Sequence, residues 1–86
     1  MADYKVTFKA SVDKDLADLP KDLVARVWQR FELLKQEPFP RQALKLEGSE
    51  ALYRIRVGDY RIIYDVTREE LVVLVIRIGH RREVYR

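Results

Sequence analysis

The end of the sequence holds several residue types that can move protons or bind phosphate. After Gly79 come the only histidine, His80, three arginines, one glutamate and one tyrosine, in the order HRREVYR. Histidine changes charge near neutral pH and can take or give a proton. A tyrosine such as Tyr85 can donate a proton or stack on a nucleic-acid base. These residues indicate acid–base chemistry on a phosphate-containing substrate.

A second set of candidate residues lies on an expected β-hairpin. The segments LYRIRV (52–57) and YRIIYDV (60–66) alternate apolar and polar residues, and a two-residue Gly58–Asp59 turn joins them. This turn places Arg56 directly opposite Arg61, and residues that lie opposite each other share a face. One face therefore carries Arg54, Arg56 and Arg61. The other face is apolar and suited to be covered by helices: Tyr53, Ile55, Val57, Tyr60, Ile62 and Tyr64.

This arginine clustering has an electrostatic cost. Like charges directly opposite each other on a sheet repel by roughly 0.2–1 kcal/mol per pair. All eight basic residues of residues 51–86 are arginines, whose planar fork matches phosphate geometry. The face is either an anion site or a surface network in which Asp59 and Asp65 relieve the repulsion, and the sequence leaves both interpretations open.

The next turn decides whether the chain end joins this face. If Thr67 pairs with Glu70 around Arg68–Glu69, Ile76 lies opposite Arg61. The residues after Gly79 then emerge beside the hairpin turn. This register predicts that the end segment reaches Arg56 and Arg61 and supplies a group of further candidates: His80, Arg81, Arg82 and Tyr85.

Several arginines with one histidine and a tyrosine suit metal-free cleavage of RNA. The internal 2′-hydroxyl attacks the adjacent phosphorus, and arginines stabilise the charge that develops on the phosphate oxygens. One group must remove the 2′-proton and another must protonate the leaving 5′-oxygen. Arginine cannot act as the base. His80 is a candidate for either proton-transfer role.

The elements that must position these residues can be read from hydrophobic spacing. We expect a strand at 4–9, a helix capped by Ser11 with an apolar stripe at Val12, Leu16 and Leu19, and a helix from Lys21 to Glu37. A loop at 38–51 precedes the hairpin, and a buried strand at 71–78 ends at Gly79. The order predicts one α+β domain over residues 1–86. Its N-terminal strand and two-helix hairpin precede an antiparallel three-stranded meander, and the helices pack on one face of one sheet.

Composition limits the function classes. The absence of cysteine excludes disulfides and cysteine-bound metals, and a single histidine argues against a zinc site, so we expect no metal and no cofactor. The longest apolar run, Leu71–Ile76, is too short to span a bilayer, and the first residues show no signal-peptide pattern. We therefore expect a cytoplasmic protein with no membrane partner.

Two motifs, YRIRVGDYRIIY and GHRREVY, resemble the RelE/ParE superfamily of toxins from type II toxin–antitoxin systems, and more narrowly its RelE branch. The resemblance implies an endoribonuclease that cleaves mRNA in the ribosomal A site and inhibits translation. It also implies neutralisation by an acidic RelB-like antitoxin, with operator DNA bound only through the toxin–antitoxin complex.

The resemblance also suggests roles for individual residues. Two lysines, an arginine, and a later arginine and tyrosine carry the activity of RelE-like toxins. Their positions correspond here to Arg54, Arg56, Arg61, Arg81 and Tyr85, and Arg82 joins the four arginines as a phosphate-binding candidate. Arginine at both lysine positions keeps the charge but removes a lysine that could deprotonate. We therefore expect His80, with Glu83 behind it, as the replacement base, while His80, Glu83 and Tyr85 all remain open for proton transfer.

Two other functions fit the same pattern. A ParE-like toxin would poison DNA gyrase without cleaving nucleic acid, whereas the histidine, arginines and tyrosine at the chain end favour the nuclease. A catalytically impaired toxin would act only as a binding module for its antitoxin, and arginine at both lysine positions keeps this alternative open.

Overall fold

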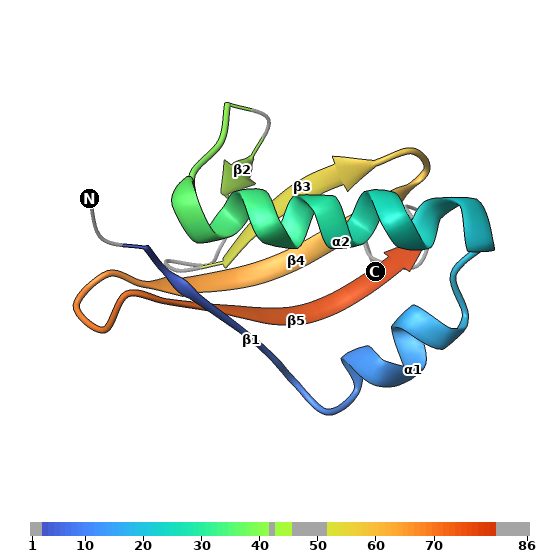
Figure 1. The fold of residues 1–86 in the computed structure, drawn as a ribbon, viewed down its shortest axis with the longest axis horizontal. Helices are drawn as coiled ribbons and strands as arrows, with labels where there is room; N and C mark the ends of the chain where they lie inside the picture. Colours follow the sequence, from blue (N-terminus) through green and yellow to red (C-terminus); the bar gives the residue numbers. More distant parts are fainter. Residues whose placement is uncertain (1–2, 42, 46–51, 81–86) are drawn as a thin grey trace.

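The computed structural model describes residues 3–41, 43–45 and 52–80 (Figure 1). Their strands form one sheet in the order β1-β5-β4-β3-β2, in which β1 runs parallel to β5 and the other neighbours are antiparallel. The elements, in chain order, are β1 (Lys5–Phe8), α1 (Val12–Ala17), α2 (Lys21–Gln36), β2 (Leu44–Lys45), β3 (Leu52–Val57), β4 (Tyr60–Thr67) and β5 (Val72–His80). The predicted α+β class with its N-terminal strand and helices is confirmed.

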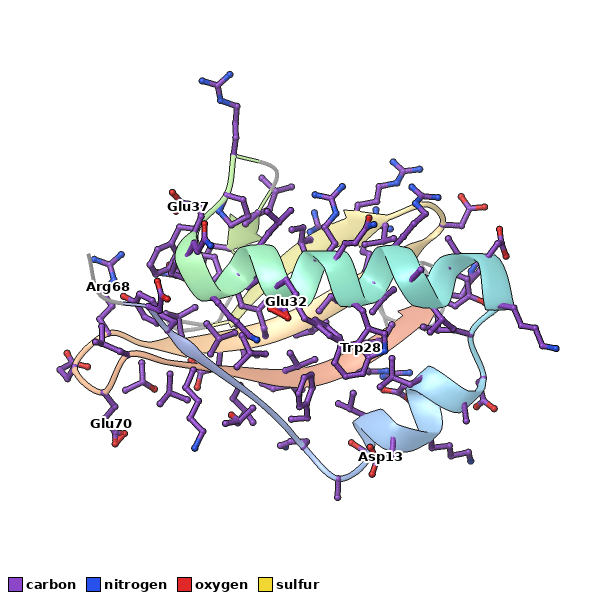
Figure 2. The ribbon with its side chains drawn as sticks, in the orientation of Figure 1. Asp13, Trp28, Glu32, Glu37, Arg68 and Glu70 are labelled. Carbon is purple, nitrogen blue, oxygen red and sulfur yellow. The ribbon has the colours of Figure 1, made fainter. Side chains whose placement is uncertain are left out.

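The core lies between one face of this sheet and the helices. On α2, buried residues recur at helical spacing, at Leu23, Val27, Phe31 and Leu34. They pack against the hairpin face that the sequence predicts to be covered, where Ile62 and Tyr64 are both 0% exposed. In Figure 1, α2 lies across β3 and β4, while α1 lies near the end of β5, and Figure 2 adds the side chains in the same view. The helices therefore cover the face opposite the one that carries Arg54, Arg56 and Arg61.

Helix α1 is held to the sheet by an aspartate rather than capped by its serine. Ser11 occupies the N-cap position, but its side chain makes no capping hydrogen bond, so the predicted cap is wrong. Instead, Asp15 Oδ2 accepts a 2.9 Å hydrogen bond from the backbone N–H of Ile78 on β5. This contact ties the short helix to the last described strand.

Two predicted boundaries differ from the structure. The expected loop at 38–51 contains β2, whose two residues pair with Tyr53 and Arg54. Strand β5 does not end at Gly79, because Gly79 pairs with Arg61 and His80 pairs with Tyr60. A buried glycine inside a strand is compatible with pairing and simply leaves one face without a side chain.

The register between β4 and β5 also differs from the prediction. Thr67 pairs with Val72 rather than Glu70, so the turn is two residues longer than expected. Leu71 closes this turn with a positive φ of 57°, a conformation that the sequence gives no sign of because leucine rarely adopts it. A bulge between Ile63 and Tyr64 then adds one further residue on β5. Gly79, and not Ile76, therefore lies opposite Arg61.

No helix in the described ranges is both long and apolar enough to cross a membrane.

Candidate nucleic-acid interface

The β3–β4 hairpin has the register that its turn predicts. Val57 pairs with Tyr60, Arg56 with Arg61, and Arg54 with Ile63. Gly58 has a φ of 59°, which suits the first position of a two-residue hairpin turn. The structure therefore brings Arg54, Arg56 and Arg61 together on the sheet face away from the helices, hereafter the open face.

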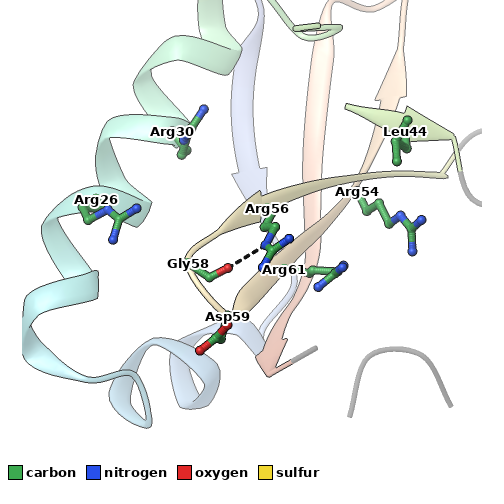
Figure 3. A pocket seen from close by; sticks show the side chains of 8 residues that line it. All are labelled: Arg26, Arg30, Leu44, Arg54, Arg56, Gly58, Asp59 and Arg61. Atoms are coloured by element: carbon green, nitrogen blue, oxygen red, sulfur yellow. Dashed lines mark hydrogen bonds between the residues drawn. The ribbon is translucent and has the colours of Figure 1, made fainter. Parts of the chain in front are cut away.

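These arginines line a cleft of about 650 Å³. Figure 3 shows that it lies around the hairpin and is bounded on the other side by α2. Its described lining contains five arginines and one acid: Arg26, Arg30, Leu44, Arg54, Arg56, Gly58, Asp59 and Arg61. A cleft with this lining attracts anions and provides several guanidinium donors for phosphate oxygens.

One of these guanidinium groups is held by a hydrogen bond, and another is partly shielded from solvent. Arg56 Nε donates a 2.9 Å hydrogen bond to the carbonyl oxygen of Gly58, which leaves its two terminal nitrogens for a ligand (Figure 3). Arg61 is half-buried, and its Nη1 atom is shielded from solvent. Restricted donors lose less conformational freedom when they bind an anion.

Within the described part of the chain, Asp59 and Asp65 do not form the arginine–aspartate network that was the alternative to an anion site. Asp59 borders the cleft and Asp65 pairs with Leu52, yet neither makes a salt bridge to a described residue. The repulsion between Arg56 and Arg61 is therefore not relieved by the two acids that the sequence offered for this purpose.

His80 lies on the other side of the sheet from the three arginines. It pairs with Tyr60, and the two rings meet edge to face with centroids 5.4 Å apart. The histidine borders a small cavity of about 160 Å³ that Asp15 and Asp18 of α1 also line. The predicted position of His80 beside Arg56 and Arg61 is therefore wrong. The bulge is the cause, because an odd shift in register moves a side chain to the opposite face.

The same shift in register puts Arg77 on the open face. Arg77 pairs with Ile63, which in turn pairs with Arg54, so the three residues form one row across the sheet. Sequence reasoning missed Arg77 because it lies inside an apolar run. It also missed Arg26 and Arg30, although their spacing of four residues on α2 was a usable signal.

The other predicted site residues lie outside the described residues: Arg81, Arg82, Glu83 and Tyr85. Their roles stay predictions.

Comparison with known proteins identifies the family. A family model described as the ParE toxin of the type II toxin–antitoxin system parDE matches residues 6–85. RelE1 of Methanocaldococcus jannaschii is 30% identical over 86 residues, covering 96% of each chain. The chain belongs to the RelE/ParE toxin superfamily.

Within this superfamily, the toxin is RelE-like. Toxin RelG of Mycobacterium tuberculosis is 30% identical over 84 residues, covering 96% of this chain and 97% of RelG. The fold matches the crystal structure of the archaeal RelE–RelB complex from Pyrococcus horikoshii with a TM-score of 0.81 and 37% identity. That match covers 91% of this chain and 94% of the other.

One buried tyrosine of the RelE-like toxin is unsuited to acid–base chemistry. The Tyr64 hydroxyl donates a 2.9 Å hydrogen bond to the carbonyl oxygen of Pro38. Burial, with smaller contributions from Tyr53 and Glu37, raises its pKa well above the ordinary value. Tyr64 therefore stays protonated and structural, and any tyrosine that moves a proton in this toxin must be a different one.

Proposed function

We propose that this RelE-like toxin is a ribosome-dependent endoribonuclease that cleaves mRNA in the A site and thereby inhibits translation. The observation that carries the proposal is the open-face cluster of Arg54, Arg56 and Arg61, three guanidinium groups that line one cleft. Toxin family membership supports it.

The proposed reaction breaks one phosphodiester bond by internal attack. The 2′-oxygen forms a bond to phosphorus as the bond from phosphorus to the 5′-oxygen breaks. The products are a 2′,3′-cyclic phosphate and a free 5′-hydroxyl. The 2′-proton passes to a base and an acid protonates the leaving oxygen. The arginines donate hydrogen bonds to the phosphate oxygens as charge develops there.

In this proposal the open-face arginines bind and stabilise the phosphate, and the chain end supplies the proton-transfer groups. Arg81 and Arg82 add phosphate contacts, and Tyr85 or Glu83 transfers protons. His80 was the first candidate for the base, but its position beside Tyr60 and the acids of α1 weighs against that role.

The partner we propose is an acidic RelB-like antitoxin. The Pyrococcus relative is a complex of RelE with RelB. An acidic segment would complement the arginine-lined cleft of this chain. Operator DNA would then be bound only through the complex.

The test is primer extension on mRNA bound to purified ribosomes. Wild-type toxin is expected to produce codon-phased cuts. Arg61→Ala should slow cleavage by about 100- to 1,000-fold, the usual cost of removing a donor to the developing charge. Arg41→Ala is the control, because Arg41 is exposed and does not line the cleft.

Two further variants test which residues transfer protons in the reaction. Tyr85→Phe should slow cleavage if its hydroxyl is the acid. His80→Gln should leave the rate unchanged across neutral pH, and a large loss would restore the histidine to the mechanism.

A second candidate is gyrase inhibition, which the description of the matched family model as ParE favours. Growth arrest with intact mRNA and trapped gyrase–DNA complexes would reject the nuclease in favour of this function. Antitoxin binding without any arrest would instead identify a binding module.

A further inference from the structure

Two arginines on α2 border the cleft from the side opposite the open face. Arg26 and Arg30 are four residues apart, so they occupy one face of the helix on successive turns. Figure 3 shows both side chains on the helix that flanks the β3–β4 hairpin, and both line the cleft. Neither belongs to the set of residues to which the proposed cleavage assigns a role.

The charged residues of α2 differ in whether they form salt bridges. Near its end, Lys35 forms a 2.7 Å salt bridge with Glu32. Within the described ranges, Arg26 and Arg30 form none, although Asp22 stands four residues before Arg26. Like charges at this spacing cost a helix roughly 0.2–0.5 kcal/mol. Both arginines of the helix therefore face the cleft without a salt bridge to a described residue.

Arg26 and Arg56 both lie close to Gly58 of the hairpin turn. Arg56 Nε is bonded to the Gly58 carbonyl oxygen, as described above. A Cβ atom built on Gly58 would lie 3.9 Å from Arg26 Nη1 and 3.5 Å from Leu23 Cδ2. A guanidinium from the helix and one from the open face thus both lie close to the same glycine.

One edge of β3 has no strand partner at this point among the described residues. Strand β2 pairs with Tyr53 and Arg54, so on the edge away from β4 no described strand pairs with Ile55–Val57. The cleft therefore passes from the open face around this edge to α2 (Figure 3).

We propose that Arg26 and Arg30 form a second phosphate subsite, which binds the backbone of single-stranded RNA beside the phosphate held by Arg54, Arg56 and Arg61. The inference rests on the proposed function, because it assigns RNA to the same cleft. Leu44, 55% exposed at the rim, offers an apolar surface to a base.

The lining favours RNA over an acidic peptide. Arginine forks match phosphate oxygens, and successive arginines suit the regularly spaced charges of a nucleic-acid backbone. Peptides that bind a sheet edge take specificity from pockets for alternate side chains. Among its described lining residues, this cleft has one large apolar side chain, Leu44, and five arginines.

The test is the salt dependence of RNA binding, measured by fluorescence anisotropy with a 2′-O-methylated single-stranded RNA that cannot be cleaved. The logarithm of the binding constant falls with the logarithm of salt concentration by about 0.7 for each phosphate contacted on a single strand. The double variant Arg26→Gln/Arg30→Gln should therefore lower the slope by about 1.4. It should not alter binding of a dinucleoside monophosphate, which has only one phosphate.

The matched control is Arg41→Gln/Arg68→Gln, which removes the same charge from exposed positions outside the cleft lining. It should leave the slope unchanged. Arg26→Lys/Arg30→Lys keeps the charge and should therefore retain most of the wild-type slope. Circular dichroism verifies that each variant is folded.

A slope equal to that of the control pair would overturn the inference. So would a loss confined to binding of poly-glutamate, which would assign the two arginines to an acidic protein. If wild-type toxin shows the predicted slope but leaves ribosome-bound mRNA intact, cleavage is rejected and the subsite stands. If it cleaves and the slope does not respond to the double variant, only the subsite is rejected.

Discussion

The two faces of the β3–β4 hairpin are built from alternate residues of the same strands, yet they follow opposite rules. On the helix face, Ile55, Ile62 and Tyr64 are at most 2% exposed and pack into the core. On the open face, Arg56 lies directly opposite Arg61, and the neighbouring acids do not pair with either within the described chain. The first face lowers the free energy of the folded state. The second raises it slightly, because it places like charges directly opposite each other.

The largest effect is expected on the helix face. Ile62→Ala removes most of a fully buried side chain and should lower the free energy of unfolding by about 2–5 kcal/mol. Urea denaturation measures this loss. Leu44→Ala, at an exposed aliphatic residue, should change stability by no more than about 0.5 kcal/mol. Equal losses in the two variants would show that the faces do not differ in the way described.

A smaller loss of stability should follow from removing the buried hydroxyl of Tyr64 on the helix face. Tyr64→Phe leaves the carbonyl oxygen of buried Pro38 without its donor and should cost about 1–3 kcal/mol in the same denaturation experiment. Tyr60→Phe is the control, because the described structure gives the Tyr60 hydroxyl no hydrogen bond. A neutral Tyr64→Phe would assign the residue to packing alone.

The smallest effect should have the opposite sign. Arg56→Thr removes one of two opposed cations and should raise the free energy of unfolding by about 0.2–1 kcal/mol while weakening RNA binding. The gain should shrink as salt is added, because salt screens exposed charges. Arg77→Thr is the control, since Arg77 faces Ile63 and no cation. Destabilisation by Arg56→Thr would mean that the open face serves the fold.

A comparison of the β3–β4 and β4–β5 hairpins explains which parts of the fold could be predicted from the sequence. Gly58–Asp59 permits only a two-residue turn between its alternating strands, so the pairing of Arg56 with Arg61 could be derived directly. The turn before β5 depends on a leucine with positive φ, and the bulge after Ile63 has no marker residue. Both depend on tertiary packing, which local patterns do not encode.

The same difference decided which site residues were found. Arg54, Arg56 and Arg61 were located because their faces follow from one tight turn. His80 was misplaced and Arg77 was missed because the face of every residue beyond the bulge depends on one added residue. Arg26 and Arg30 required knowledge of where α2 lies relative to the edge of β3, which is a property of the assembled fold.

The pairing of β1 with β5 has a consequence for the timing of synthesis. Among the described strands, β1 pairs with β5 alone, the Thr7 hydroxyl donates a hydrogen bond to the carbonyl oxygen of Val73, 66 residues later, and β5 separates β1 from β4. A growing chain therefore cannot complete the described sheet until β5 has been made, and such distant pairings form slowly. A cell that translates this message is exposed to a folded toxin only after β5 has left the ribosome.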